Sequence, residues 1–206
     1  MENKSFAFWN RLFGLLVFLI ALITYMMTVE PTASFWDAGE YISTSAKLQV
    51  GHPPGAPLFQ MLGAVFASFA QNPEKIALMV NMMSVFSSAF TILFLFWTIT
   101  LLLTKLFPFE NLTNPSDKFI FFSSASVGSL SLCFSDSFWF NAVEAEVYAM
   151  AMLILSILFY LALKWEKEMN NPRGDRWLLL ISFIIGLSFG VHFMGLLTIP
   201  AIGMLY

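Results

Sequence analysis

The sequence has little charge and almost no cysteine. Only 11% of its 206 residues are Asp, Glu, Lys or Arg, and 58% are hydrophobic. A soluble domain carries about 25% charged residues, so these few charges cannot cover a surface that faces water. The net charge of −3 excludes the basic surface that nucleic-acid binding requires. A single cysteine, Cys133, excludes an intrachain disulfide, and its apolar neighbours predict a buried, inert thiol.

Long apolar runs take the place of the missing charge. A helix that crosses the hydrocarbon core needs about 20 apolar residues. The runs predict an all-α, polytopic transmembrane helical bundle with spans at about 8–29, 76–103, 119–134, 147–163, 177–193 and from 196 onward. The first run is longer than the 7–15 residues or so of a signal-peptide core, so we expect an uncleaved anchor. The chain stops inside an apolar run, which suggests that residues 1–206 form the N-terminal part of one longer transmembrane domain.

The run at 57–70 is shorter, at roughly 14 residues, which favours a helix lying along the membrane surface over a span. Charge supports this interpretation. If the run does not cross, eight cations fall on one side: Lys4, Arg11, Lys105, Lys118, Lys164, Lys167, Arg173 and Arg176. Only Lys47 and Lys75 fall on the other side. Cytoplasmic loops are enriched in Lys and Arg, so the N-terminus is predicted to be cytoplasmic, with juxtamembrane helices at about 38–50 and 57–70 outside.

The outer face is then acidic. It holds seven of the thirteen acids: Glu30, Asp37, Glu40, Glu74, Asp136, Glu144 and Glu146. Five tryptophans fall near the predicted interfaces, as an aromatic belt requires: Trp9, Trp36, Trp139, Trp165 and Trp177. No charge lies at the centre of a span, which counts against a transporter module. A transporter and a non-catalytic scaffold of the cell envelope both remain alternatives to an enzyme.

The first outer loop, residues 30–52, carries the most suggestive chemistry. Asp37 and Glu40 stand three residues apart, so on a helix they share a face. Two such carboxylates can act as a general base or bind a cation. The same spacing is that of a capping box, with Asp37 at the N-cap and Glu40 three positions on. Both interpretations are open from the sequence.

Two histidines and two further acids also allow both a functional and a structural interpretation. His52-Pro53-Pro54-Gly55 predicts a stiff turn in which His52 contacts a phosphate or is a simple interfacial side chain. Glu144 and Glu146 precede a span, where carboxylates favour the positive end of the helix dipole. They equally suit a site shared with Asp37, because ionisable groups at membrane depth are functional candidates. His192 lies at the outer end of a span and is either a packing residue or part of this site.

The order of these motifs resembles a known family. They are Trp36-Asp37-x-Gly39-Glu40, His52-Pro53-Pro54-Gly55-x-Pro57-Leu58, Phe138-Trp139, Glu144-x-Glu146-Val147-Tyr148, and Gly186 to His192. Together they resemble a membrane family common in Bacteroidota and long catalogued as a domain of unknown function. That family is similar to the vertebrate transmembrane O-mannosyltransferase of plexin-type domains and, more distantly, to the GT-C glycosyltransferases. The resemblance covers nearly the whole chain.

The resemblance implies sugar transfer from a polyprenyl-phosphate carrier to an acceptor hydroxyl. It makes Asp37 the expected catalytic base and Glu40 the second candidate. The residues it implies for binding donor or acceptor are His52, Lys47, Glu144, Glu146, Tyr148 and His192. His52 and His192 would meet the phosphate, and Lys47 is the one outward cation poised for it.

The remaining expectations concern cofactors, partners and location. No cofactor beyond the polyprenyl-phosphate sugar is implied, and a requirement for a divalent metal stays open. The expected partners are the lipid bilayer, the lipid-linked sugar and a protein or glycan acceptor, with no nucleic acid. The expected location is the bacterial inner membrane, with the acidic loops in the periplasm. Related enzymes take phosphate-binding groups from later spans, so activity is expected of the full-length protein.

Overall fold

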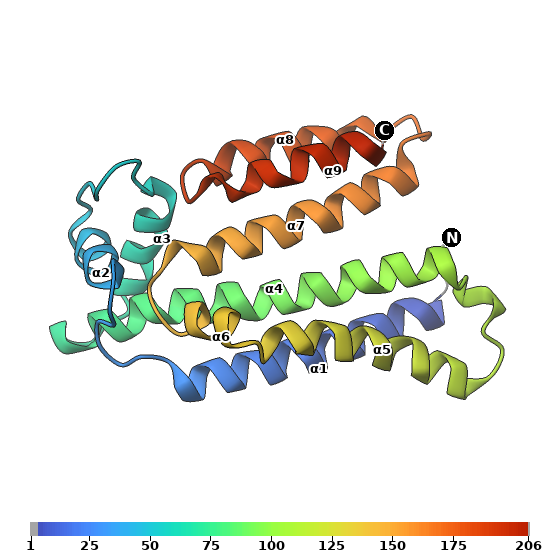
Figure 1. The fold of residues 1–206 in the computed structure, drawn as a ribbon, viewed down its shortest axis with the longest axis horizontal. Coiled ribbons are helices and arrows are strands. Elements are labelled where there is room, and N and C mark those ends of the chain that lie inside the picture. The colour runs from blue at the N-terminus through green and yellow to red at the C-terminus, as the bar shows by residue number, and fades with distance from the viewer. Residues whose placement is uncertain (1–3, 206) are drawn as a thin grey trace.

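A computed structural model describes residues 4–205, and helices are the only regular structure in that range (Figure 1). The helices are α1 (Lys4–Thr28), α2 (Ala38–Lys47), α3 (Pro57–Ala67), α4 (Ile76–Leu106), α5 (Pro115–Cys133), α6 (Asp136–Ala142), α7 (Val147–Glu168), α8 (Asp175–Ser188) and α9 (Thr198–Leu205). Short 3₁₀ helices are η1 (Pro73–Lys75), η2 (Phe109–Asn111) and η3 (Phe193–Leu197). The all-α prediction is confirmed.

Three helices are long and apolar enough to cross a membrane. They are α1, the continuous segment η1–α4, and α7, and a fourth span results if α5 and α6, bent by 70°, are counted as one. The chain is therefore an integral membrane helical bundle. The helix expected over 177–193 begins at Asp175 and ends at Ser188. Beyond Ser188 the N–H groups of Val191 and His192 both donate to its carbonyl in a tight turn, at 2.9 and 2.8 Å, and the backbone becomes extended at His192.

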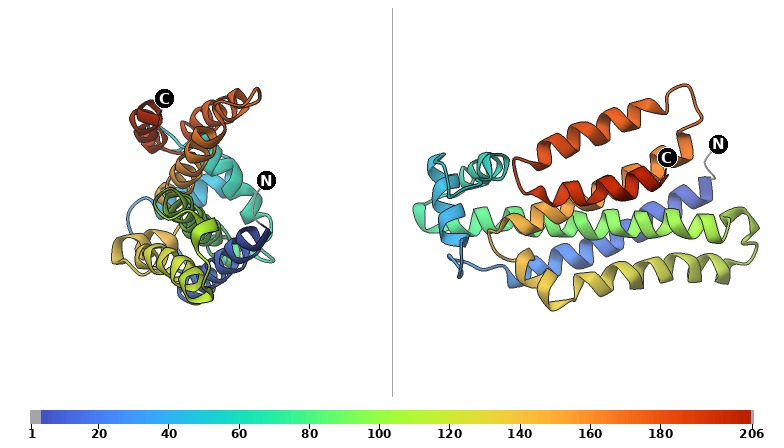
Figure 2. Two further views of the ribbon diagram at one scale, coloured as in Figure 1. Left: turned by 90° about the vertical axis from the view of Figure 1, so that its right-hand side faces the viewer. Right: turned by 45° about the horizontal axis from the view of Figure 1, so that its top comes forward.

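Helix α4 is the centre of the bundle and packs against α1, α5 and α7 (Figures 1 and 2). One apolar core joins α1, α4 and α5, and a second joins α3, α7 and α8. In the first core the buried Tyr25 hydroxyl donates to the Cys133 carbonyl at 2.9 Å, which ties α1 to the end of α5. Cys133 is a buried free thiol, as predicted.

The connections divide between the two ends of the bundle. The segment from α1 to α4, the α6 region and the turn after α8 meet at one end, whereas both termini lie at the other (Figure 1). At this second end Lys105 of α4 pairs with Glu166 of α7. The charge pattern of the sequence likewise assigns the connections at these two ends to opposite faces of the membrane. Which face is cytoplasmic stays a prediction.

Helices α2 and α3 form a small cap over the first end of the bundle. Pro57 occupies the first turn of α3, where its missing N–H costs nothing. The two helices touch at Gly63, where a Cβ atom would lie 2.5 Å from the Ser45 hydroxyl, so only glycine permits this approach. The opposite side of α3 exposes Met61 and Val65. At 11 residues α3 is too short to span a membrane, and its apolar outer side suits an interfacial helix.

Candidate functional site

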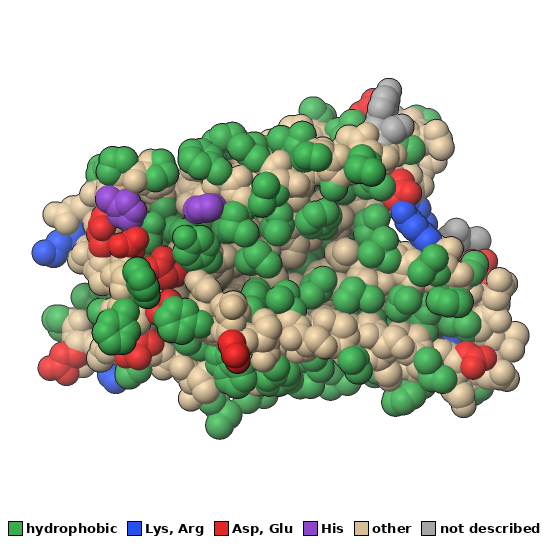
Figure 3. All heavy atoms as spheres, viewed as in Figure 1, with side chains coloured by type: hydrophobic (Ala, Val, Ile, Leu, Met, Phe, Trp, Pro, Cys, Tyr) green, Lys and Arg blue, Asp and Glu red, His purple; other side chains and the backbone are tan. Residues whose placement is uncertain are grey.

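A cavity of about 370 Å³ opens at the end of the bundle that carries α2 and α3. Three segments far apart in the sequence form its walls: the first loop, the α6–α7 connection and the turn between α8 and η3. Six of the eight candidate residues line it: Asp37, His52, Glu144, Glu146, Tyr148 and His192. Figure 3 shows histidine and acidic side chains gathered at this end of the molecule.

Asp37 stands at the N-cap position of α2, yet its side chain makes no capping hydrogen bond. Its carbonyl accepts from the Tyr41 N–H at 2.9 Å and so begins the helix. The capping-box interpretation is therefore wrong, because Glu40 also points away from the N-cap, toward His52. The Asp37 carboxylate is 58% exposed and faces the cavity.

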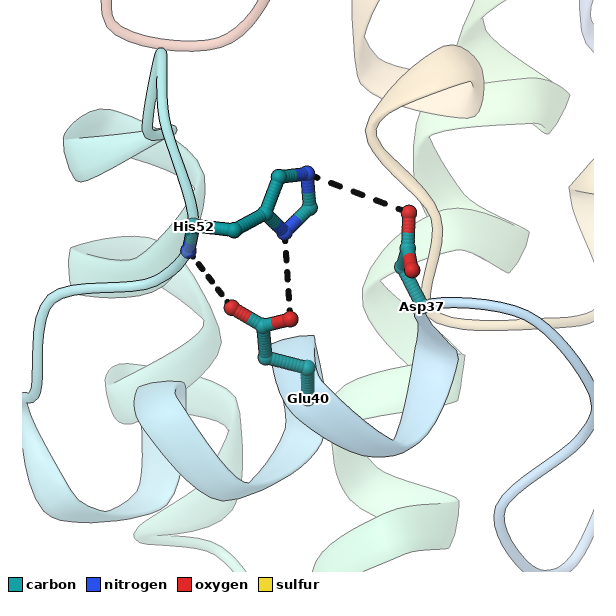
Figure 4. A group of neighbouring side chains, drawn as sticks. All are labelled: Asp37, Glu40 and His52. Carbon is teal, nitrogen blue, oxygen red and sulfur yellow. Dashed lines mark hydrogen bonds and ion pairs between the residues drawn. The ribbon is translucent and has the colours of Figure 1, made fainter.

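Glu40 holds His52 at two points (Figure 4). One carboxylate oxygen accepts from the His52 backbone N–H at 2.6 Å, and the other lies 3.0 Å from the ring Nδ1. The backbone hydrogen bond is the main reason that the pKa of Glu40 is lowered, with the ring as the second cause. The hydrogen bond to Glu40, then its charge, raises the pKa of His52. Glu40 therefore acts on the site through His52 and does not itself line the cavity.

The predicted turn at His52 is present, since the Gly55 N–H donates to the His52 carbonyl at 2.9 Å. Gly55 takes a left-handed φ of 82°, which favours glycine. With Nδ1 directed at Glu40, the other ring nitrogen, Nε2, faces Asp37 at 3.9 Å. The result is a carboxylate–imidazole–carboxylate row in which the imidazole has a fixed orientation.

We expect Glu40→Gln to return the pKa of His52 toward the ordinary value of 6.5, because the amide carries no charge. The pH dependence of carbethoxylation of the imidazole, measured on the peptide that contains His52, reports this change. Glu74→Gln, which alters an exposed acid of η1, is the matched control. An unchanged titration of His52 in Glu40→Gln would show that the two side chains do not interact.

Glu144 and Glu146 are both buried, with 3% and 6% of their surfaces exposed. Burial raises the pKa of Glu144, and the nearby Ser34 hydroxyl partly offsets that effect. Burial, followed by the charges of Glu144 and Asp37, raises the pKa of Glu146 to about 7. The backbone N–H groups of Asp37 and Val147 near the carboxylate partly offset this rise in the pKa of Glu146. Glu146 thus stands at the N-cap of α7 and shares the cavity wall with Asp37, so the helix-end and shared-site interpretations both apply to it.

Further polar contacts dock the first loop onto its neighbours. The Glu30 N–H donates to the Val143 carbonyl at 3.0 Å. Asn81, fully buried in α4, donates its amide to the carbonyls of Glu30 at 2.6 Å and Thr32 at 2.9 Å. The sequence interpretation missed Asn81. An amide in the first half of an apolar span was the available signal, because polar groups there seek partners.

His192 lies at the N-cap of η3, where its Nδ1 accepts from the Met194 N–H at 3.2 Å. An accepting Nδ1 carries no proton, so the neutral ring bears its proton on Nε2. Its ring centroid lies 5.5 Å from that of Tyr148. His192 therefore lines the cavity with its Nδ1 already engaged, and its Nε2–H is the ring group left to donate a hydrogen bond.

Trp36, next to Asp37, has the left-handed φ of 59°. Such a conformation costs about 1–3 kcal/mol in a bulky residue and persists only where the surroundings enforce it. Here Asn81 donates to the carbonyl of Thr32 before Trp36, and the buried Glu146 carboxylate lies near the backbone N–H of Asp37 after it. The indole is 86% exposed and lines the cavity.

Lys47 is the candidate that the structure does not bring to the site. It lies exposed in the last turn of α2 and is absent from the cavity wall. The lining contains no lysine or arginine among the described residues. Asp37, Glu40 and His52 place ligand atoms within 4.8 Å of one another, which is close enough to share a cation.

The fold and the site define a polytopic helical membrane protein with an acidic, histidine-containing cavity at one end of its bundle. The chain belongs to the family described as the N-terminal domain of the protein O-mannosyl-transferase TMEM260, whose sequence model matches residues 37–206. It is 26% identical over 166 residues to the "Protein O-mannosyl-transferase tmem260" of Dictyostelium discoideum. The match covers 79% of this chain but only 18% of that relative. No solved structure matches. Membership supports a glycosyltransferase-like function at the level of the family.

Proposed function

We propose that the full-length protein is a GT-C-like glycosyltransferase that transfers a sugar from a polyprenyl-phosphate donor to an acceptor hydroxyl. The observation that carries the proposal is the cavity, in which one exposed carboxylate, Asp37, meets two differently oriented imidazoles and two buried acids. The relative's printed name specifies protein O-mannosylation, which makes a protein hydroxyl the preferred acceptor. A glycan hydroxyl is the other acceptor class.

In the proposed reaction the acceptor oxygen attacks the anomeric carbon, and the bond from that carbon to the phosphate oxygen breaks. Polyprenyl phosphate leaves with the bonding electrons, and Asp37 takes the proton of the hydroxyl. Asp37 suits this role because its carboxylate is exposed to the cavity and free of capping bonds. His52, with its Nε2 near Asp37, and His192, with its Nε2–H, are the groups available to contact the phosphate.

The site is proposed to face the periplasm of a bacterial inner membrane. The charge pattern supports this side, because the cations concentrate at the opposite end of the bundle. Labelling of single cysteines, introduced at Glu74 and at Arg173 in a background without other cysteines, tests the orientation in intact cells. We expect an impermeant maleimide to label position 74 only.

The direct test of function uses the purified full-length protein with radiolabelled polyprenyl-phosphate mannose and extracted periplasmic proteins as acceptors. We expect label to move from the lipid to protein. The assay is run with and without a chelator, because Asp37, Glu40 and His52 offer ligand atoms for a divalent cation. Binding of the lipid without transfer to any acceptor would contradict the enzymatic proposal, and binding of no lipid would favour a scaffold.

A further inference from the structure

Aromatic side chains surround the acidic cavity on several sides. Besides Trp36, the wall contains four partly exposed rings: Phe140, Tyr148, Phe189 and Phe193. They come from α6, α7, the turn after α8 and the start of η3, so the rim is assembled by the fold and not by one local run. Flat apolar faces above a set of carboxylates match a ligand that has both an apolar face and a hydroxyl-bearing edge.

We propose that Trp36 is a stacking platform for the pyranose ring of the donor. This inference rests on the proposed function and adds the site of its sugar. The C–H face of a hexose would lie on the indole, and its hydroxyls would meet the carboxylates and the His192 N–H. The donor sugar is preferred to an acceptor glycan because a protein hydroxyl is the preferred acceptor, which leaves the donor as the source of a pyranose ring in the cavity.

The backbone of Trp36 supports a ligand role over simple anchoring. An exposed tryptophan at this level also suits the aromatic belt of a membrane protein. A belt residue needs no special backbone conformation, however, whereas Trp36 is held at a φ of 59°. Phe35, its neighbour, is 82% exposed without lining the cavity, so it has the exposure of a belt residue alone.

The polar contacts around the first loop explain how this conformation is kept. Asn81 donates to the carbonyl of Thr32 on one side of Trp36, and the Glu146 carboxylate lies near the backbone N–H of Asp37 on the other. Both partners are buried, at 0% and 6% exposure. The indole therefore extends from a fixed backbone toward the cavity instead of sampling the membrane surface.

The test compares two lipids with purified full-length protein: polyprenyl-phosphate mannose and polyprenyl phosphate without sugar. We expect Trp36→Leu to weaken binding of the first roughly tenfold and to leave binding of the second unchanged. Trp36→Phe, which keeps a flat ring, should retain most of the affinity. Phe35→Leu is the matched control and should change neither dissociation constant.

Each other result has a distinct meaning. Equal weakening of both lipids by Trp36→Leu would assign Trp36 to membrane anchoring and overturn the platform. Unchanged binding of both lipids, or equal affinity of the unaltered protein for the two, would also overturn it while leaving the proposed transferase intact. Failure of the unaltered protein to bind either lipid would overturn the proposed function and the platform together.

Discussion

Replacing Asp37 with asparagine in the full-length protein should abolish sugar transfer while leaving its abundance in the membrane unchanged. Asparagine has the same shape but cannot take a proton from the acceptor, and loss of a general base typically costs about 10²–10⁴-fold in rate. Folding should be unaffected because the Asp37 side chain makes no capping bond and is 58% exposed. Transfer of radiolabel from polyprenyl-phosphate mannose measures the rate, and immunoblotting of membranes measures abundance.

Asp136→Asn is the matched control for this experiment. Asp136 is an exposed acid in the first turn of α6, at the same end of the bundle, but it does not line the cavity. Its replacement removes one negative charge from that end without touching the site, so transfer should continue at the normal rate. Normal transfer by Asp37→Asn would exclude Asp37 as the base.

The second large effect is expected at Glu146. Glu146→Ala removes the carboxylate that lies near the N–H groups of Asp37 and Val147, and loss of an acceptor from a buried donor costs about 1–3 kcal/mol. The first loop should loosen, so both the thermal midpoint and the transfer rate should fall. Glu146→Gln keeps a carbonyl acceptor and should retain much of both. Melting in detergent and the transfer assay measure the two effects, and equal behaviour of the Ala and Gln variants would contradict a hydrogen-bonding role.

Glu146 also makes a prediction about pH. Its pKa rises from the ordinary 4.5 to about 7 in the folded protein, so the folded state binds the proton more tightly than the unfolded state. The stabilisation is complete below pH 4.5 and is lost as the pH rises through about 7, with a change on the order of 3 kcal/mol at most. Glutamine cannot ionise. The melting temperature of Glu146→Gln, relative to the unaltered protein, should therefore be higher at pH 8 than at pH 5, and a pH-independent difference would contradict the burial of this charge.

Much of the bundle could be predicted from the sequence because long apolar runs have few alternatives to helix in a membrane. The runs at 8–29, 76–103 and 147–163 correspond to α1, α4 and α7. The early end of α8 at Ser188 could not be predicted in the same way. It depends on the hydrogen bonds of the following turn and on close packing at Gly190, whose Cβ would lie 2.8 Å from the Cβ of Leu58. Such contacts between distant segments are invisible to hydropathy.

The candidate site was predictable as a list of residues but not as a set of roles. Acids and histidines in predicted outer loops identified Asp37, His52 and Glu146, which meet in one cavity. The spacing of Asp37 and Glu40 allowed a capping box. In the structure the Glu40 carboxylate instead accepts from the N–H of His52, twelve residues later. Lys47 was a candidate for phosphate binding because of its charge alone. It lies in the last turn of α2 and does not line the cavity. Tertiary folding decides these partners.

The docking of the first loop has a consequence for biosynthesis. Residues 30–37 leave the ribosome long before Asn81 and the segment 143–146 that hold them, because synthesis proceeds from the N-terminus. Asp37 and Trp36 therefore cannot reach their final geometry when the first span inserts. They do so only after the chain has been made through the start of α7 and that segment has arrived on the same side of the membrane. Until then, an unfinished chain carries its acids without an organised cavity.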